Sequence, residues 1–454
     1  MEKFIKMILH KNLKDIIVTK KTNILKITKI IDKNGFNGVF VCEKKNKLVG
    51  IITDSDLRKL ILKNQFSKKL IAEKIMNKNY LSIGQKINLS DYEKILINSE
   101  KTLIPILKNK ILIDFIHLSD LKNKVNTNDR ILIIGGFGYI GSLLTERLLK
   151  KGKKVTILDK NFYGNFLQSK TKKNKNLRVI FGDCFDKNKI AKALKNCKHV
   201  IHLGEIVGDP ATSINSNFSI RNNYENTNFV LSECIKHNIH KFIFASSCSV
   251  YGQTNKICNE KSKLNPVSLY AKCKIASEKS ILSHKSKTFC PVILRLSTVY
   301  GDSPRKRFDL VVNRFVIMTI KKIQIKLFGA SSWRPFISVS DVARAFDKIL
   351  HTKNEVIKDQ IFNVGGKNEN YKILDIVKII SKFHKIDYSF IKTVDDKRNY
   401  RVSFSKIQNL VNFKLKNKLP DVIKLLLKKY KKQKININNI NYYNEKKIFY
   451  ILNK

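Results

Sequence analysis

The sequence predicts an α/β protein in two parts: a small repeated module over residues 1–125, then a doubly wound parallel sheet completed by a smaller C-terminal lobe. Three observations support this fold class. The first part carries the same strand–turn–strand–helix pattern twice, the second alternates short apolar strands with helical stretches, and a glycine-rich turn follows the first of those strands. A chain of 454 residues is too long to fold around one hydrophobic core, so its length also predicts two or three domains.

Charge and cysteine usage limit the class of protein. Lys and Arg outnumber Asp and Glu by 89 to 36, but the lysines are spread along the whole chain without an arginine-rich arm. We therefore expect a solvated basic surface and no nucleic-acid partner. The eight cysteines form no Cys-x-x-Cys pair, which argues against a metal site or disulfide framework and favours a reducing, cytoplasmic location. No apolar run is long enough to predict a membrane span.

The first part begins with a helix and a hairpin. Ile24, Ile27 and Ile31 lie three and four residues apart, the spacing of one helical face. Two short apolar runs, 38–42 and 48–52, then flank a turn rich in lysine and asparagine. This order predicts a helix packed on a two-stranded hairpin.

A Thr-x-x-Asp element, Thr53 to Asp56, opens the next helix, and Asp120 is its equivalent in the second copy of the repeat. At these residues the segment 5–123 resembles a tandem pair of CBS domains. By that resemblance Thr53 and Asp56 bind an adenine nucleotide, with the carboxylate on the ribose hydroxyls. The second copy is degenerate, because His117 replaces its hydroxyl residue. The alternative is a ligand-free pair that serves assembly.

From residue 130 the pattern changes to strands alternating with helices, the sign of a parallel sheet. Strands are expected over 130–134, 155–158, 179–181, 200–203 and 242–245. After Gly301 the pattern is less regular, as expected for a smaller substrate-binding lobe that ends near residue 430. The lysine- and asparagine-rich tail, 431–454, is assigned no function.

The glycine-rich turn, Gly-Gly-x-Gly-x-x-Gly over 135–141, directly follows the first of these strands and opens a helix. Glycines allow the tight turn, the close approach of a pyrophosphate and the packing of the helix, whose free N–H groups face the phosphates. Asp159 ends the next strand, where a carboxylate accepts hydrogen bonds from the adenosine ribose and repels a 2′-phosphate. The arrangement predicts a Rossmann-type domain that binds NAD rather than NADP. The neighbouring Lys160 slightly weakens that preference.

A Tyr-x-x-x-Lys pair follows further along the chain. Tyr270 and Lys274 lie at positions i and i+4, hence on one face of a helix. A nearby ammonium favours the phenolate, which can serve as a general base while nicotinamide accepts a hydride. Ser247, at an expected strand end, places a hydroxyl where it can meet the same substrate.

At this constellation, residues 130–430 resemble extended short-chain dehydrogenases acting on nucleotide sugars. Further stretches that carry the resemblance are 202–204, 295–301, 307–313, 333–337 and 396–400. The resemblance implies that Ser247, Tyr270 and Lys274 form a catalytic triad and that the protein is a homodimer. It implies cofactor contacts for Gly135, Gly138, Tyr139, Ile140, Gly141, Asp159, Asp183 (at the adenine), Leu203, Gly204, Tyr270 and Lys274. The nucleotide diphosphate of the substrate would be held by Asn313, Arg334 and Arg398.

Members of this family that are 4,6-dehydratases carry an Asp-Glu pair after the catalytic hydroxyl residue, where this chain has Cys248 and Ser249. Without that acid and base, dehydration is disfavoured. We therefore expect NAD-dependent C4 epimerisation of a nucleotide-diphosphate sugar, as in polysaccharide biosynthesis. Tyr270 would deprotonate the C4 hydroxyl, Ser247 would share its hydrogen bond, and Lys274 would lower the pKa of Tyr270. The alternatives are a 4-ketoreductase or dehydrogenase, and a non-catalytic, nucleotide-sensing protein.

Overall fold

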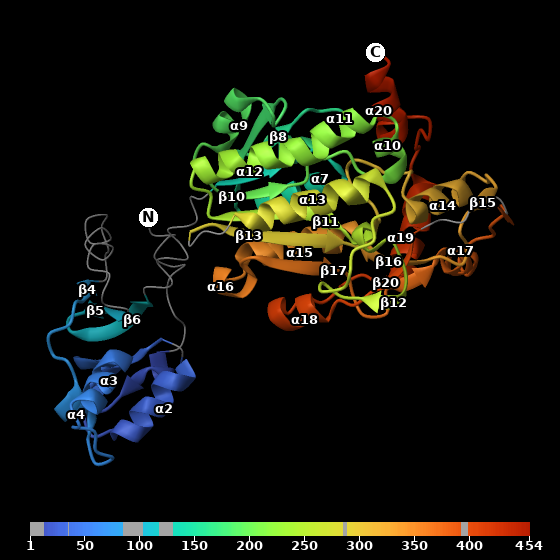
Figure 1. Ribbon diagram of the computed structural model, residues 1–454. Helices are drawn as coiled ribbons and strands as arrows, with labels where there is room; N and C mark the ends of the chain where they lie inside the picture. The colour runs from blue at the N-terminus through green and yellow to red at the C-terminus, as the bar shows by residue number, and fades with distance from the viewer. Residues whose placement is uncertain (1–12, 35, 85–102, 118–129, 285–287, 392–397) are drawn as a thin grey trace. The chain divides into compact units, whose positions relative to one another are not determined.

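The structure is a computed structural model that describes residues 13–34, 36–84, 103–117, 130–284, 288–391 and 398–454. The chain divides into two compact units, Met1–Thr127 and Asn128–Lys454 (Figure 1). Within the described residues, no helix is both long enough and apolar enough to cross a membrane.

The first unit contains two three-stranded sheets with the same topology. In each sheet the first strand pairs parallel to the second, and the second pairs antiparallel to the third. The strands are β1 (Ile17–Val18), β2 (Gly38–Cys42), β3 (Leu48–Thr53), β4 (Ile83–Gly84), β5 (Leu103–Lys108) and β6 (Ile111–His117). The helices are α2 (Ile24–Asn34), α3 (Asp54–Leu62) and α4 (Ala72–Ile75), with single turns η1 (Leu13–Asp15) and η2 (Lys44–Asn46). The internal repeat predicted from the sequence is therefore confirmed by the order and direction of the strands.

The two halves of this unit share part of their core. The Phe115 ring, from β6 in the second half, lies 5.6 Å from the ring of Phe40 and 5.0 Å from that of Phe36, both in the first half. The predicted helical face is also confirmed, since Ile24, Ile27 and Ile31 are the buried residues of α2. Asp120, the predicted equivalent of Asp56, lies outside the described residues.

The second unit is built on a seven-stranded, fully parallel sheet in the order β17-β13-β11-β10-β7-β8-β9. Its strands are β7 (Arg130–Ile134), β8 (Lys154–Asp159), β9 (Leu177–Phe181), β10 (Cys197–His202), β11 (Lys241–Ser247), β13 (Cys290–Leu296) and β17 (Gln360–Val364). The five strands expected from the sequence are β7 to β11, and the predicted fold class is confirmed.

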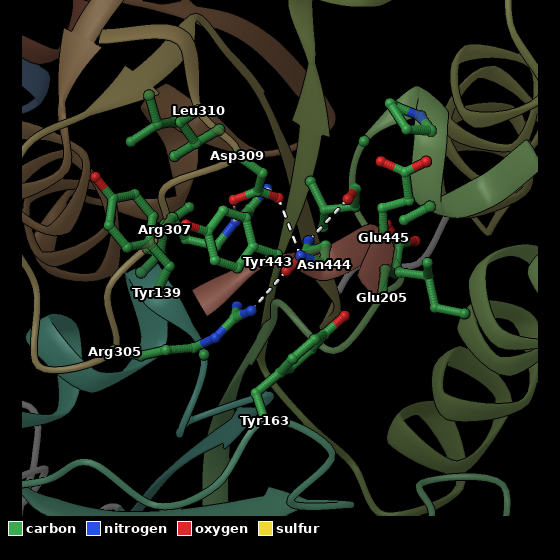
Figure 2. Close-up of a pocket in the computed structure, with 18 of the residues that line it drawn as sticks. Tyr139, Tyr163, Glu205, Arg305, Arg307, Asp309, Leu310, Tyr443, Asn444 and Glu445 are labelled. Atoms are coloured by element: carbon green, nitrogen blue, oxygen red, sulfur yellow. Dashed lines mark hydrogen bonds and ion pairs between the residues drawn. The ribbon is translucent and has the colours of Figure 1, made fainter. Parts of the chain in front are cut away.

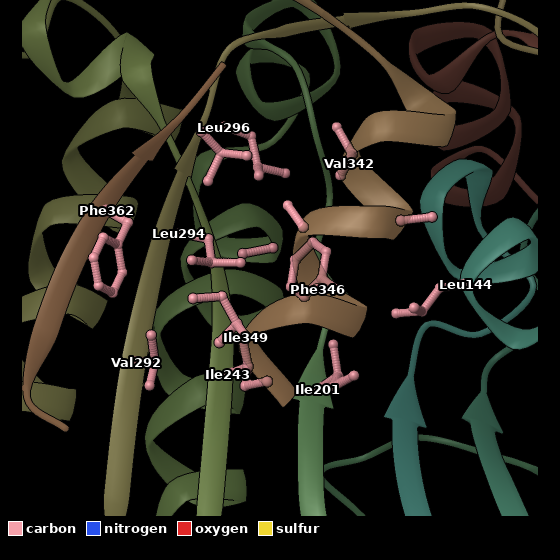
Figure 3. Packing of buried hydrophobic residues seen from close by; sticks show 14 of the residues in the cluster. Leu144, Ile201, Ile243, Val292, Leu294, Leu296, Val342, Phe346, Ile349 and Phe362 are labelled. Atoms are coloured by element: carbon pink, nitrogen blue, oxygen red, sulfur yellow. The ribbon is translucent and has the colours of Figure 1, made fainter. Parts of the chain in front are cut away.

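Both faces of this sheet are covered, because alternate residues of each strand point to opposite sides. Ile131 and Ile133 of β7 pack in the cluster that contains helices α7 (Tyr139–Lys150) and α15 (Val339–His351). Figure 3 shows Phe346 of α15 among the strand residues of that cluster. The intervening residue, Leu132, packs on the other side, against α9 (Lys187–Leu194) and α12 (Asn226–Lys236).

The remaining helices of the sheet layer connect its strands. They are α8 (Ser169–Lys172), α10 (Asp209–Ser213), α11 (Ser216–Ile220), α13 (Leu269–Ser283) and α16 (Asn354–Ile357), with a π-helical turn η4 (Arg221–Glu225) and a 3-10 turn η5 (Cys248–Tyr251). α18 (Ser405–Val411) also packs on this layer through Ile407 and Val411.

A second core lies mainly after residue 300 and is rich in aromatic side chains. Its strands are short: β14 (Thr298–Tyr300), β15 (Ile325–Leu327), β16 (Trp333–Ser338), β18 (Asn370–Lys372) and β19 (Tyr388–Phe390), with β12 (Gln253–Cys258) paired to β20 (Asn399–Val402) nearby. Its helices are α14 (Val311–Ile320), α17 (Ile373–Ser381) and α19 (Leu419–Lys432). This irregular lobe stands where the sequence pattern loses its period.

The C-terminal segment folds back onto the body of the second unit. The turn η6 (Ile440–Tyr442) leads into α20 (Asn444–Leu452), which lies beside α10 (Figure 1). Ile448 of α20 is fully buried and packs with Ile206 and Ala211. The sequence analysis assigned this segment no function, yet it reaches the cavity described below.

One buried carboxylate ties α7 to α15. Asp347 of α15 accepts hydrogen bonds from Arg147 Nε of α7 at 2.6 Å and from Lys151 Nζ, directly after α7, at 2.5 Å, and its own side chain is 3% exposed. Burial alone would raise the pKa of Asp347, but hydrogen bonds from His351, Lys151 and Arg147 outweigh it and hold that pKa well below its usual value. Asp347 therefore favours the folded state at neutral pH.

We predict that Asp347→Asn lowers the free energy of unfolding of this unit by about 1–2 kcal/mol at pH 7, less than for a fully buried pair because both cations are partly exposed. Since the folded pKa is depressed, the deficit should be complete above the unfolded pKa, about 4, and should shrink as the pH falls below it. Urea unfolding followed by the fluorescence of Trp333, the single tryptophan, measures this. The matched control is Asp387→Asn on the exposed surface; equal losses at pH 7 and pH 3 would contradict the prediction.

Candidate active site

The site lies where the order of strands along the parallel sheet reverses, next to β7. From β7 the chain proceeds to β8 and β9 on one side, whereas β10 and β11 lie on the other. In open α/β sheets the carboxyl ends of the strands at such a switch point form the ligand-binding crevice. Here they border a cavity of about 1100 Å³, with walls from the glycine-rich turn, the ends of β8, β10 and β11, and helix α13.

The glycine-rich turn has the geometry that a bound diphosphate requires. Gly135 adopts φ +80°, and a Cβ there would lie 2.8 Å from the Cα of Gly204, at the end of β10. A Cβ on Gly141 would lie 2.2 Å from the carbonyl oxygen of Gly135. Gly138 caps α7 and lines the cavity with Tyr139, so the N-terminus of this helix opens into the space. The turn therefore fits a dinucleotide.

Asp159, the last residue of β8, lines the cavity. Its carboxylate accepts hydrogen bonds from the backbone N–H groups of Phe137 (2.9 Å) and Asn161 (2.7 Å), and burial raises its pKa. The ammonium of Lys160 lies 2.7 Å from the carboxylate of Asp183. Lys160 is thus neutralised within the protein, which removes the objection to NAD that its charge raised.

Asp183 itself was expected at the adenine. The cavity is lined instead by its neighbours Gly182 and Cys184, while the Asp183 carboxylate is held by Lys160. The contact expected of Asp183 is therefore not visible in the wall of the cavity. The other expected residues, Ile140 and Leu203 included, do line it.

The three residues expected to be catalytic meet on one side of the cavity. Ser247 ends β11, and Tyr270 and Lys274 lie one turn apart near the start of α13, where the Ser268 hydroxyl caps the helix by accepting the N–H of Ala271. The Lys274 ammonium lies 5.6 Å from the centre of the Tyr270 ring. Backbone geometry of one strand end and one helical turn is enough to bring the trio together.

A fourth residue, Glu205, joins this group and was missed by the sequence analysis. Its carboxylate pairs with the Lys274 ammonium and accepts a hydrogen bond from the Thr227 hydroxyl at 3.2 Å. The side chains of Lys274 and Glu205 are 3% and 2% exposed. The sequence feature that could have predicted Glu205 as a site residue is its position, directly after Gly204 at the carboxyl end of β10.

Glu205 changes the expected electrostatics of the base. The sequence predicted that Lys274 lowers the pKa of Tyr270, but burial raises that pKa well above its usual value and the negative charges of Glu205 and Asp209 add to the effect. A hydrogen bond with Ser247 opposes it. Burial is the main cause of the raised pKa of Tyr270, and a lowering of that pKa by Lys274 stays a prediction.

The residues expected to hold the substrate diphosphate separate into two groups. Arg334 and Arg398 line the cavity, and Arg398 Nη1 lies 2.9 Å from the carboxylate of Asp209. Asn313 is fully buried outside it. Its side-chain oxygen accepts the N–H of Gly301 at 2.8 Å, and its Nδ2 donates to the carbonyl of the same residue at 3.1 Å. Asn313 fixes the loop after β14 and is not part of the cavity wall.

The cavity wall also contains residues that the sequence analysis did not single out for binding. Two buried arginines, Arg305 and Arg307, lie on the loop after β14, and Tyr443, Asn444 and Glu445 come from the C-terminal segment (Figure 2). The stretch beginning at Arg307 had served only to identify the family. No local sequence pattern predicted that the C-terminal segment lines the cavity, because lysine and asparagine dominate that part of the chain.

These features agree with comparisons to known proteins. A sequence model of the NAD dependent epimerase/dehydratase family matches residues 131–365, more than half of the chain. The chain belongs to this family. NAD is accordingly its cofactor, as the sequence predicted. A model of the CBS domain matches residues 8–63.

The proteins similar to this chain are named for different reactions of nucleotide sugars. The chain is 30% identical to an uncharacterized UDP-glucose epimerase of Bacillus subtilis, over 64% of this chain and 95% of that protein. It is 29% identical to a UDP-N-acetyl-alpha-D-glucosaminuronate decarboxylase of Bacillus cytotoxicus, over 65% of this chain and 90% of that protein. Among solved structures, UDP-glucuronic acid 4-epimerase from Bacillus cereus, in complex with UDP-glucuronic acid and NAD, matches with 28% identity and a TM-score of 0.59, over 66% of this chain and 99% of that one.

In the CBS-like unit, the expected nucleotide residues are bonded to each other. The Asp56 carboxylate accepts hydrogen bonds from the Thr53 backbone N–H at 2.9 Å and from the Thr53 hydroxyl at 2.7 Å. The Thr53 hydroxyl oxygen in turn accepts the backbone N–H of Asp56 at 3.3 Å and so caps α3. The pair is therefore preformed at the junction of β3 and α3.

Glu205 yields a prediction about pH dependence. Glu205→Gln removes one of the charges that raise the pKa of Tyr270, so the phenolate should form at lower pH. The acidic limb of the profile of kcat/KM against pH should move to lower pH. The phenolate absorbance of Tyr270, recognised because it is missing in Tyr270→Phe, should also develop at lower pH. Glu445→Gln, at an exposed position of the same cavity, is the control and should leave them in place. An unmoved limb in Glu205→Gln would remove Glu205 from this role.

Proposed function

We propose that the chain catalyses the C4 epimerisation of a nucleotide-diphosphate sugar by transient oxidation at that carbon. The observation that carries the proposal is the convergence of Ser247, Tyr270 and Lys274 on one cavity with the glycine-rich turn. The similarity to a UDP-glucose epimerase and to a UDP-glucuronic acid 4-epimerase supports it.

In this mechanism the side chains handle the proton. NAD, when bound, supplies the chemistry of a reversible hydride acceptor. The Tyr270 phenolate oxygen takes the proton from the C4 hydroxyl of the sugar, becoming the phenol, and returns that proton after the sugar has turned over. Ser247, in hydrogen-bond contact with Tyr270, orients the hydroxyl that reacts. Lys274, fixed by Glu205 and by the Ala245 carbonyl, keeps a positive charge beside the ring of Tyr270.

Two residues argue against dehydration. Cys248 is fully buried, donates its thiol to the Arg295 carbonyl, and has a pKa raised by burial, so it cannot act as an acid near neutral pH. Ser249 lines the cavity but brings only a hydroxyl. Neither replaces the acid–base pair that elimination of water requires.

We predict that the purified full chain retains NAD and interconverts a UDP-sugar with its C4 epimer without added cofactor. The hydride returns within each turnover, so tight retention of NAD does not slow the cycle. Proton NMR of UDP-glucose, UDP-N-acetylglucosamine and UDP-glucuronate detects the change at C4. Tyr270→Phe should lower turnover by about 10²–10⁴-fold while leaving the NAD content unchanged.

Other products would contradict the epimerase proposal in distinct ways. Conversion that stops after one equivalent and resumes on adding NAD or NADH indicates a dehydrogenase or ketoreductase. Release of CO₂ from UDP-glucuronate indicates a decarboxylase. Retained NAD with no conversion of any UDP-sugar favours the nucleotide-sensing alternative.

We also propose that Thr53 and Asp56 bind the ribose of an adenine nucleotide. The match to the CBS domain and the preformed Thr53–Asp56 pair support this. In calorimetric titrations of the NAD-saturated full chain with ATP, ADP and AMP, Asp56→Asn should weaken binding about tenfold, since it removes a charged acceptor. Asp54→Asn, in the same helical turn, should not. Absence of saturable binding in the parent chain would leave the assembly alternative.

A further inference from the structure

The loop after β14 buries two arginines but pairs only one of them with a carboxylate. Arg307 is held by Asp309 through both oxygens, with Nε–Oδ1 at 2.7 Å and Nη2–Oδ2 at 2.8 Å. Arg305 is 2% exposed and bonds only neutral groups, the Asn441 carbonyl at 3.1 Å and the Asn444 side-chain oxygen at 2.6 Å. Across the described ranges of the chain, no carboxylate lies within ion-pair distance of Arg305.

An aromatic residue with an unpartnered hydroxyl is stacked against this guanidinium. The Tyr163 ring lies 3.6 Å from it, and the Tyr163 hydroxyl oxygen is buried with no hydrogen-bond partner. Burial lowers the pKa of Arg305 to about 10, and the positive charge of Arg307 acts in the same direction. A buried cation without a counter-ion is costly, so the cluster favours an anionic ligand.

The loop places Arg305 on the wall that faces the dinucleotide turn. The Tyr139 hydroxyl donates to the Gly301 carbonyl at 2.6 Å, and the Ser142 and Ser303 hydroxyls lie 3.0 Å apart. These contacts fasten the loop to the first two turns of α7, whose N-terminus opens into the same cavity. The guanidinium of Arg305 and the N–H groups of α7 thus line a single space.

The C-terminal segment holds Arg305 in position. Asn444, 3% exposed, accepts from Arg305, donates its backbone N–H to Asp309 at 3.1 Å, and donates its side-chain amide to the Val207 carbonyl at 2.8 Å. One asparagine therefore joins the loop after β14, the loop after β10 and α20. Figure 2 shows Asn444 between Arg305 and Asp309.

We propose that Arg305, oriented by Asn444 and stacked on Tyr163, is a diphosphate-binding residue of this cavity. The planar guanidinium, with Nη1 not used by the protein contacts above, matches phosphate oxygens in a forked geometry. The ligand is the diphosphate of NAD or that of the sugar nucleotide. Only for the sugar nucleotide does this proposal rest on the proposed function.

The test uses the full chain and Arg305→Met, which keeps most of the bulk and removes the charge. NAD retention is measured as its dissociation rate after gel filtration, and UDP affinity by calorimetry on NAD-saturated protein. We expect about a tenfold to hundredfold loss in one of them, as for a charged hydrogen bond. Faster NAD release alone assigns Arg305 to the cofactor, weaker UDP binding alone assigns it to the substrate, and loss of both assigns it to a position between them.

Controls separate binding from folding. Arg401→Met removes an arginine outside the cavity that likewise stacks on an aromatic ring, that of Trp333, and bonds a carbonyl; it should leave both measurements unchanged. Asn444→Asp places a carboxylate of equal size against Arg305 and should weaken the same ligand, even if Arg305→Met unfolds. NAD release and UDP affinity equal to the parent chain in folded Arg305→Met and Asn444→Asp would overturn the proposal. Neither measurement requires turnover, so failure of the proposed epimerisation is seen separately.

Discussion

The close approach of two glycine turns, at the ends of β7 and β10, sets the geometry of the second unit. A side chain on Gly135 would collide with the backbone of Gly204, so the two strand ends can meet only without one. This contact leaves the N-terminus of α7 open on one side and places Glu205 immediately beyond Gly204 on the other. The glycine-rich turn and the buried Glu205 are therefore positioned by the same close contact between Gly135 and Gly204.

Buried charges divide the cavity into two electrostatic regions. Around Tyr270, burial and the negative charges of Glu205 and Asp209 raise the pKa of the phenol. At the other region, Arg305 brings a positive charge that no carboxylate of the described chain neutralises. In a poorly hydrated space such charges act strongly over short distances. On the two proposals above, a nucleotide sugar is oriented with its phosphates at the arginines and its sugar at Tyr270.

Local patterns in the sequence were enough to predict the fold class, because the strands of a covered parallel sheet are uniformly apolar and the glycine turn has a fixed place after the first of them. They also identified Ser247, Tyr270 and Lys274, whose spacing is set by one helical turn and one strand end. They failed for Asn313, whose amide is consumed by backbone groups of Gly301. Periodicity cannot reveal which polar side chain is already satisfied by a distant loop, and the same limit hid Glu205.

The C-terminal segment shows the other limit of local reasoning, and its packing bears on how the enzyme cycles. Nothing in a lysine-rich stretch predicts that Ile448 is buried against Ile206 and Ala211, or that Asn444 bonds two separate loops. With the segment in place, the wall of the cavity is made from three parts of the chain, and the hydrogen bonds of this asparagine reach all three. A cofactor that must exchange at every turnover is poorly served by such a wall. A cofactor that regains its oxidised form in each cycle, as we propose for this chain, is not hindered by it.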